Sequence, residues 1–109
     1  MKKLTVFLDV DGILCPDYHE RFREAPKREE YIRFINWMRN NGFKIVVYTF
    51  KKTEWEYQER IKQLNRWGLE YDEIQLKPDY DFIVDDKAVA SLDLMKKIIE
   101  KMKGEKFYE

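Results

Sequence analysis

The stretch that decides the fold is Leu4-Thr5-Val6-Phe7-Leu8-Asp9-Val10-Asp11-Gly12. It runs from apolar and β-favouring residues directly into two carboxylates spaced i, i+2. Alternate side chains of an extended segment share a face, so Asp9 and Asp11 point the same way. A strand covered by helices on both faces reads as such a continuous apolar run. Because functional groups of open α/β sheets gather at the carboxyl ends of strands, the stretch predicts a buried strand with an acidic pair at its functional end.

The sequence Asp-x-Asp-Gly has a second interpretation as a strand-to-turn junction, in which Asp and Gly serve only the geometry of the loop. A calcium-binding loop of the EF-hand type is disfavoured, because that loop needs further acidic ligands, a downstream Glu and flanking helices. The motif alone leaves catalysis and loop geometry equally open. The remainder of the chain has to distinguish them.

Composition limits the classes of function. The 109 residues fit one domain, and 44% apolar residues are enough for a core. With 21 basic and 21 acidic residues the net charge is zero, which gives no support for general electrostatic binding of nucleic acid, although a local basic patch stays open.

The single cysteine, Cys15, excludes an internal disulfide framework and suits a reducing compartment. No signal peptide or membrane-spanning stretch is recognisable, so we expect a soluble, cytoplasmic protein without membrane contact.

Helical and extended patterns alternate along the chain. After a loop at 13–26, apolar periodicity predicts helices over 27–40, 54–67 and 88–102. Short apolar runs predict further strands over 43–49, 73–76 and 81–84. This order predicts the fold class α/β: a three-layer sandwich with a mainly parallel sheet, right-handed crossovers and helices on both faces, in one domain over 1–109.

The predicted strand ends carry polar residues. They are Asp9 with Asp11, Thr49, Lys77, and Asp85 with Asp86. Each has an ordinary structural interpretation: a β-branched strand residue for Thr49, a solvated cation for Lys77, and a helix cap for the second acidic pair. Taken together they suit phosphoryl transfer. Several carboxylates in a small space favour Mg²⁺, a hydroxyl and an ammonium hold phosphoryl oxygens, and an Asp carboxylate can be the nucleophile.

This ordered set resembles the haloacid dehalogenase (HAD) superfamily of phosphatases and phosphotransferases. The four motifs of that superfamily match Leu8–Gly12, Ile45–Thr49, Lys77-Pro78 and Phe82–Asp86, so the resemblance covers essentially the whole chain. It implies a Mg²⁺-dependent phosphomonoester hydrolase acting through an aspartyl-phosphate. No residues are left over for a cap domain, so we expect an open site.

The resemblance also implies a role for each matched residue. Asp9 is the expected nucleophile and Asp11 the general acid and base, while Thr49 hydrogen-bonds the phosphoryl group and Lys77 neutralises its charge. The expected metal ligands are Asp9, Asp11 (by its backbone carbonyl), Asp85 and Asp86. The expected substrate-binding residues are Gly12, Thr49, Phe50, Lys51 and Lys77. The loop after Gly12 is the expected mobile gate of the site.

A narrower likeness is to the small capless phosphatases linked to capsular polysaccharide biosynthesis, on the runs 67–73, 77–81 and 85–88. It implies a sugar phosphate or a similar small phosphorylated metabolite as substrate. Those proteins often carry an Arg shortly after the second-motif threonine, where this chain has Phe50-Lys51-Lys52. Capless relatives often oligomerise, so we expect a homo-oligomer that covers the open site. Further candidate substrate contacts are Tyr18, His19, Arg21, Phe22, Lys52 and Trp55.

Three other functions are alternatives to a sugar-phosphate hydrolase. A receiver domain of two-component signalling has a similar size and similar residues, but its acidic pair precedes a separate phospho-accepting Asp, an order that this chain lacks. A nucleotide or polynucleotide end phosphatase would prefer nucleoside phosphates to sugar phosphates. A non-catalytic module on the same fold would bind Mg²⁺ or phosphate without turnover.

Overall fold

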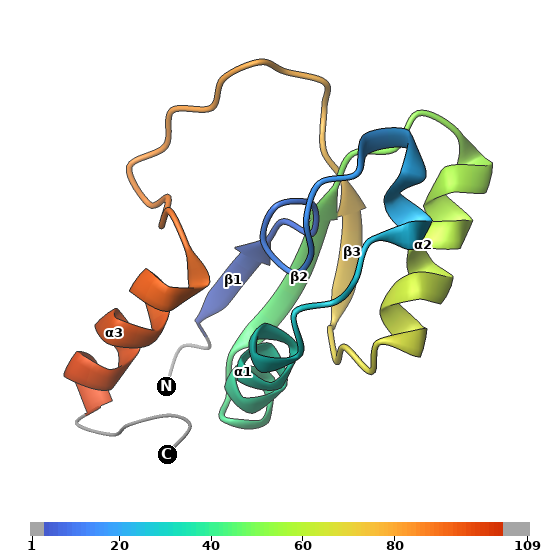
Figure 1. Cartoon of the computed structure of the whole chain (residues 1–109). Helices are drawn as coiled ribbons and strands as arrows, with labels where there is room; N and C mark the ends of the chain where they lie inside the picture. The colour runs from blue at the N-terminus through green and yellow to red at the C-terminus, as the bar shows by residue number, and fades with distance from the viewer. Residues whose placement is uncertain (1–3, 104–109) are drawn as a thin grey trace. The chain divides into compact units, whose positions relative to one another are not determined.

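The computed structural model describes residues 4–103, which divide into two compact units, Met1–Asp79 and Tyr80–Glu109. The first unit carries the whole sheet, and the second carries the last helix (Figure 1). The prediction that the chain is a single domain stays a prediction.

A three-stranded parallel sheet forms the first unit. Strands β1 (Thr5–Leu8), β2 (Lys44–Thr49) and β3 (Glu73–Leu76) lie in that order, with Leu8 paired to Val47 and Thr49 to Leu76. All three strands therefore end at the same edge, which is the upper edge in Figure 1. Helices α1 (Glu29–Asn40) and α2 (Glu54–Arg66) make the two crossovers. Both crossovers step in the same direction, and such crossovers are right-handed, so both helices cover one face of the sheet.

The core of the first unit lies between this sheet and the helices. Helix α1 buries Ile32, Phe34, Ile35 and Met38, and β2 contributes three consecutive buried residues, Ile45, Val46 and Val47. The continuous apolar run of β2 matches its place as the central strand of the parallel sheet, with β1 on one side and β3 on the other. The helix predicted over 27–40 and the strand predicted over 43–49 are confirmed within two residues.

Helix α2 begins after an N-terminal cap at Thr53. The Thr53 Oγ1 accepts a hydrogen bond from the Glu56 backbone N–H at 3.1 Å, and the Glu56 carboxylate accepts one from the Lys52 backbone N–H at 3.0 Å. The first bond satisfies one of the free donors in the first turn of the helix, and the second holds the residue that precedes the cap. They also fix the direction in which the chain leaves β2, and so the position of the helix relative to the strand ends.

The segment predicted as a loop over 13–26 contains a short 3₁₀ helix, η1 (His19–Glu24). It is anchored in the core, because Leu14, Cys15 and Phe22 are all buried. A tight turn follows β1: the Gly12 N–H donates to the Cys15 carbonyl at 2.8 Å, and Gly12 has a φ of +85°, which a residue with a side chain adopts only under strain. Residues 13–26 are therefore anchored to the core, whereas the sequence pattern predicted only an irregular loop.

The second unit differs from its prediction at two places. Residues 81–84 form no strand, and Phe82 and Val84 are 90% and 99% exposed. Residues 80–103 supply no second strand to pair with them, and an apolar run becomes a strand only when its backbone has a ladder partner. The predicted fourth strand is therefore wrong, as is the helix start at residue 88.

Helix α3 is Leu92–Lys103, and its first turn is capped by Ser91, whose Oγ accepts from the Leu94 N–H at 3.1 Å. The Asp85 carboxylate instead accepts from the Lys87 N–H at 2.7 Å and closes a local turn. A turn of this kind competes with helix, which delays the start of α3 by four residues. The alternative interpretation of Asp85-Asp86 as a helix cap does not apply, because α3 begins after Ser91.

The α/β class with a parallel open sheet is confirmed, and the layers are compatible with a three-layer sandwich. Among the described residues, no helix combines the length and the apolarity that crossing a membrane requires.

Candidate functional site

The carboxyl ends of the three strands bring Asp9 and Lys77 together. The Lys77 Nζ lies 3.0 Å from the Asp9 Oδ2, and the Asp9 Oδ1 accepts a hydrogen bond from the Val10 N–H at 2.8 Å. Asp9 follows β1 and Lys77 follows β3, so their contact spans the end of β2. Asp9 and Lys77, both expected at the site from the sequence, are thus in contact, and their catalytic roles stay predictions.

Thr49, the last residue of β2, lies between those two strand ends. It is fully buried, and its Oγ1 has no hydrogen-bond partner within the described part of the chain. Its backbone carbonyl accepts from the Lys77 N–H at 3.0 Å, which ties it to the lysine that pairs with Asp9. A buried hydroxyl without a partner is costly, so its presence at a strand end is a reason to expect a ligand oxygen there.

Asp11 is held by two cations. The Arg60 Nη2 donates to the Asp11 Oδ1 at 2.6 Å, and the Lys51 Nζ lies 3.6 Å from the Asp11 Oδ2. The Arg60 side chain is fully buried, and the Lys51 side chain is only 7% exposed. Lys51, expected at the site from the sequence, is thus found against the second carboxylate.

Burial affects the ionisation of two groups near Asp11. Desolvation lowers the pKa of Lys51, and the positive charge of Arg60 lowers it further, while the Asp11 carboxylate partly opposes both effects. Burial raises the pKa of the Cys15 thiol, and the negative charge of Asp11 adds to that effect. Cys15 is fully buried, and a raised pKa favours its neutral thiol form.

Arg60 is the residue that sequence reasoning missed. Its Nη1 donates to the Gln63 Oε1 at 2.6 Å, and the Gln63 Nε2 donates to the Phe22 carbonyl at 2.9 Å. A usable signal existed: Arg60, Gln63 and Leu64 share the i, i+3, i+4 spacing of one helix face, and all three are buried. Two polar residues on a core-facing stripe indicate a buried hydrogen-bond network, and here the network ends at Asp11.

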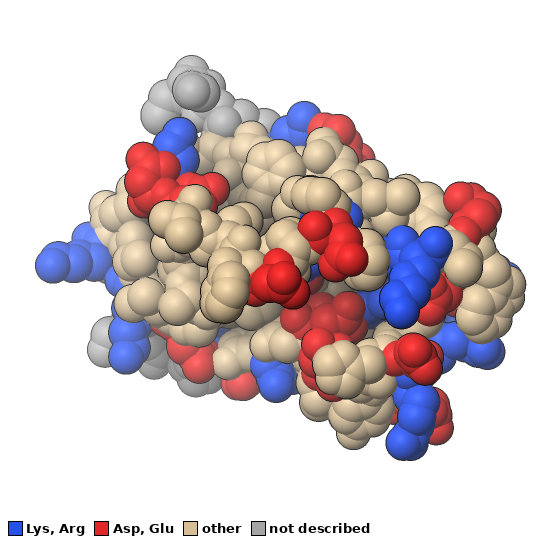
Figure 2. Space-filling view, turned by 90° about the horizontal axis from the view of Figure 1, so that it is seen from above, with Lys and Arg blue, Asp and Glu red and all other residues tan. Residues whose placement is uncertain are grey.

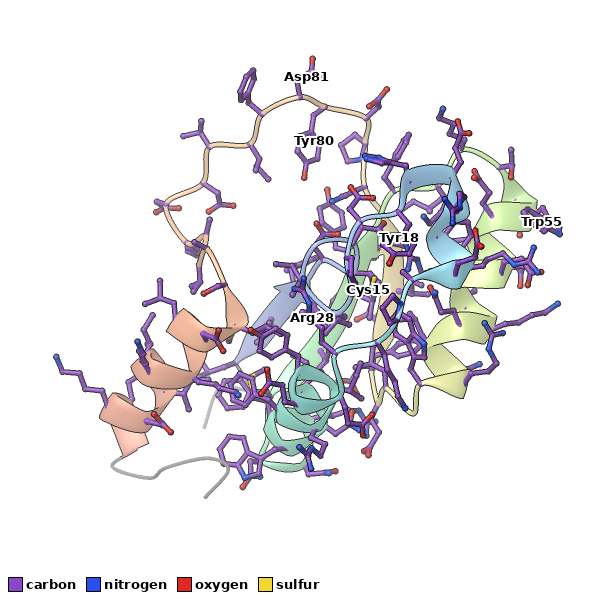
Figure 3. The ribbon with its side chains drawn as sticks, viewed as in Figure 1. Cys15, Tyr18, Arg28, Trp55, Tyr80 and Asp81 are labelled. Atoms are coloured by element: carbon purple, nitrogen blue, oxygen red, sulfur yellow. The ribbon has the colours of Figure 1, made fainter. Side chains whose placement is uncertain are left out.

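Gly12, predicted to bind substrate, begins the turn after Asp11. Its carbonyl and that of Ile13 accept from the Arg28 Nη1 at 3.3 and 3.0 Å. Figure 3 shows Arg28 and Cys15 beside this turn. Phe50, the other predicted contact in this set, is half-buried directly after Thr49.

The remaining candidate substrate contacts divide into buried and exposed residues. Phe22 is 1% exposed and packs beneath Lys51, whose Nζ lies 3.9 Å from the ring centroid, so its prediction as a substrate contact is wrong. Trp55 is exposed and points outward from the start of α2 (Figure 3). It lines an open groove of about 540 Å³ together with Glu20, Arg21, Arg23, Glu24 and Arg66.

The second acidic pair belongs to the second unit. Asp85 and Asp86 are exposed, and Figure 3 labels Tyr80 and Asp81 on the extended segment that precedes them. Within residues 4–103 no three potential metal-binding side chains form a group. The donors present are nevertheless carboxylate oxygens, and Asp9 is partly exposed to solvent, which suits Mg²⁺ chemically. Magnesium binding stays a prediction.

Charge at the strand ends is mixed. In the first unit two carboxylates, Asp9 and Asp11, meet three cations, Lys51, Arg60 and Lys77. Figure 2, which views the molecule from the side toward which the strands of Figure 1 point, shows acidic and basic side chains interspersed. A carboxylate nucleophile flanked by cations can both attack and hold an anionic group.

Two solved structures are similar to this chain. A crystal structure of a protein from Vibrio cholerae superposes with a TM-score of 0.75 at 22% identity, covering 93% of this chain and 94% of that one. A structure of a Pnkp1/Rnl/Hen1 complex superposes with a TM-score of 0.58 at 14% identity, covering 98% of this chain but only 37% of that one. No family model and no curated protein matches the chain. At these identities the likeness shows a shared fold.

Proposed function

We propose that this protein is a Mg²⁺-dependent phosphomonoester hydrolase in which Asp9 is the nucleophile. The observation that carries the proposal is the convergence of a partly exposed carboxylate, an ammonium 3.0 Å away and a buried hydroxyl without a partner, each from a different strand end. The HAD-like order of the four sequence motifs supports the same chemistry.

The first half-reaction transfers the phosphoryl group to the protein. An oxygen of the Asp9 carboxylate attacks phosphorus, the bond between phosphorus and the ester oxygen breaks, and Asp11 gives its proton to that oxygen. Lys77 keeps Asp9 in place and neutralises charge on the phosphoryl oxygens, and the Thr49 hydroxyl donates to one of them. The products are an alcohol and an aspartyl-phosphate.

The second half-reaction regenerates the protein. Water attacks the phosphorus of the aspartyl-phosphate, and the Asp11 carboxylate accepts the proton that water loses. The bond between phosphorus and the Asp9 oxygen breaks, which releases inorganic phosphate and the free carboxylate. The same Asp11 side chain serves both halves because it is an acid in the first and a base in the second.

The metal ligands in this proposal are those that the four sequence motifs imply: Asp9, Asp11 by its backbone carbonyl, Asp85 and Asp86. When bound, Mg²⁺ supplies charge neutralisation and orientation of phosphoryl oxygens. A sugar phosphate or a similar small metabolite is the proposed substrate class, and the substrate is proposed to reach the strand ends without a cap domain.

Hydrolysis of an aryl phosphate with and without Mg²⁺ tests the proposal, comparing the wild type with Asp9→Asn. The variant keeps the shape of the side chain but lacks the anionic nucleophile, so turnover should fall by at least about a thousandfold. Asp81→Asn, an exposed aspartate outside the proposed site, is the matched control and should keep full turnover. Magnesium-independent turnover, or turnover that survives Asp9→Asn, would refute the mechanism.

A screen of sugar phosphates against nucleoside 3′- and 5′-phosphates then tests the substrate class. We expect the larger kcat/KM for sugar phosphates. A consistent preference for nucleoside phosphates would instead assign the chain to nucleotide or polynucleotide end hydrolysis.

A further inference from the structure

We propose that Arg60 is a positioning residue that holds Asp11 by one carboxylate oxygen, so that the other oxygen faces the leaving group. This role rests on the proposed function, because Asp11 is its general acid. It concerns a residue that none of the four motifs contains.

The contact between Arg60 and Asp11 is a buried, charge-assisted hydrogen bond. The Nη2 donates to the Asp11 Oδ1 at 2.6 Å, and the arginine side chain is fully buried. The Asp11 Oδ2 lies farther from its cation, the Lys51 Nζ, at 3.6 Å. The carboxylate is therefore fixed through Oδ1, which leaves Oδ2 to exchange a proton with the ester oxygen or with water.

Arg60 is itself held from two further directions. The Gln63 Oε1 accepts from its Nη1 at 2.6 Å, and the Phe22 ring centroid lies 4.9 Å from its guanidinium carbon. The Gln63 Nε2 donates to the Phe22 carbonyl, so η1 is part of the same network. Burying a charged side chain costs free energy of desolvation. The buried guanidinium of Arg60 is paired with Asp11, the proposed catalytic carboxylate.

The shape of the guanidinium group explains why an arginine is needed. Its planar fork donates in two directions at once, here to Asp11 and to Gln63. A lysine ammonium at the same position keeps the charge but is a poorer match for both acceptors. Arg60→Lys should therefore retain part of the positioning, and Arg60→Gln should lose it.

The leaving group provides the readout. An alkyl phosphate needs a proton on its leaving oxygen, whereas p-nitrophenyl phosphate, with an acidic leaving group, needs little help from a general acid. We expect Arg60→Gln to lower kcat for an alkyl phosphate about 10- to 100-fold. The same variant should lower kcat for p-nitrophenyl phosphate at most about threefold. The KM for each substrate should stay within about twofold of the wild-type value. Arg66→Gln, an exposed arginine of the same helix, is the matched control and should change neither.

A double-mutant cycle tests the route of the effect. Asp11→Asn should show the same dependence on the leaving group, and Arg60→Gln added to it should cost no further activity, because the residue that Arg60 positions is already inactive. Thermal melting of each variant measures the structural cost separately. Where Arg60→Gln does not fold, Arg60→Lys gives the test, with the same pattern at smaller size.

The role of Arg60 would be overturned if Arg60→Gln lowered kcat equally for the alkyl phosphate and for p-nitrophenyl phosphate. It would also be overturned if the effects of Arg60→Gln and Asp11→Asn on activity were fully additive. Either result would leave the proposed function intact. Wild-type protein without Asp9-dependent turnover would refute the proposed function and this role together. The two failures are distinguished in one set of assays, because wild type and Asp9→Asn are measured beside the arginine variants.

Discussion

Thr49 gives the sharpest contrast between stability and function at the scale of single residues. Its hydroxyl is buried without a partner, so Thr49→Val removes an unsatisfied polar atom and keeps the volume of the side chain. We expect an unchanged or higher melting temperature together with at least about a tenfold loss of kcat/KM. A lower melting temperature with unchanged turnover would show that the hydroxyl serves only the fold.

Lys77 is expected to act through its charge. Lys77→Met keeps most of the aliphatic stem but removes the ammonium 3.0 Å from Asp9, and turnover should fall about 10²- to 10³-fold. Lys62→Met, a mostly exposed lysine of α2, is the comparison and should keep its turnover. Retained activity in Lys77→Met would show that the proposed reaction does not need the Lys77 ammonium.

Sequence alone predicted which residues stand at the ends of β1, β2 and β3 but not the partner of Asp11, and the strand expected before Asp85-Asp86 does not form. The i, i+2 spacing placed Asp9 and Asp11 together, and the end of an apolar run located Thr49. Pairing Asp11 with Arg60 depends on how α2 packs, 49 positions along the chain. Such a contact follows from tertiary structure, and only the polar residues on a buried helix face hinted at it.

At the scale of elements, the clearest local stabilising feature is the Thr53 cap at the start of α2. Thr53→Ala removes the acceptor of the Glu56 N–H and should lower the free energy of unfolding by about 1 kcal/mol. Thr53→Ser keeps the hydroxyl and should lose much less, as measured by denaturant unfolding. Equal losses in the two variants would show that the cap bond contributes nothing.

The predicted elements succeeded where periodicity and caps agreed. Helix α1 ends at Asn40, before Gly42, whose positive φ suits glycine, and β2 is continuously apolar. Residues 81–84 are equally apolar yet form no strand, because a strand depends on a neighbouring backbone that its own sequence does not encode. Helix α3 starts later than predicted because Asp85 closes a local turn and Ser91 caps the helix. Apolar periodicity does not detect either of these local hydrogen bonds.

At the scale of the whole molecule, the proposal makes Mg²⁺ a ligand of the folded protein. Magnesium should therefore raise the melting temperature of the wild type, since a ligand that binds only the folded state stabilises it. Asp85→Asn should weaken that shift and raise the Mg²⁺ concentration needed for half-maximal turnover. An identical Mg²⁺ response in wild type and Asp85→Asn would exclude that carboxylate as a ligand.

The most direct test of the central claim is the chemical identity of the phosphorylated residue. Protein mixed with an aryl phosphate and Mg²⁺ is quenched in acid within a turnover and treated with borohydride, which reduces an aspartyl-phosphate to homoserine. Peptide mass spectrometry then locates the change. The account predicts homoserine at position 9 and none in Asp9→Asn; a phosphoryl adduct at any other residue, or product release with no adduct at Asp9, would contradict it.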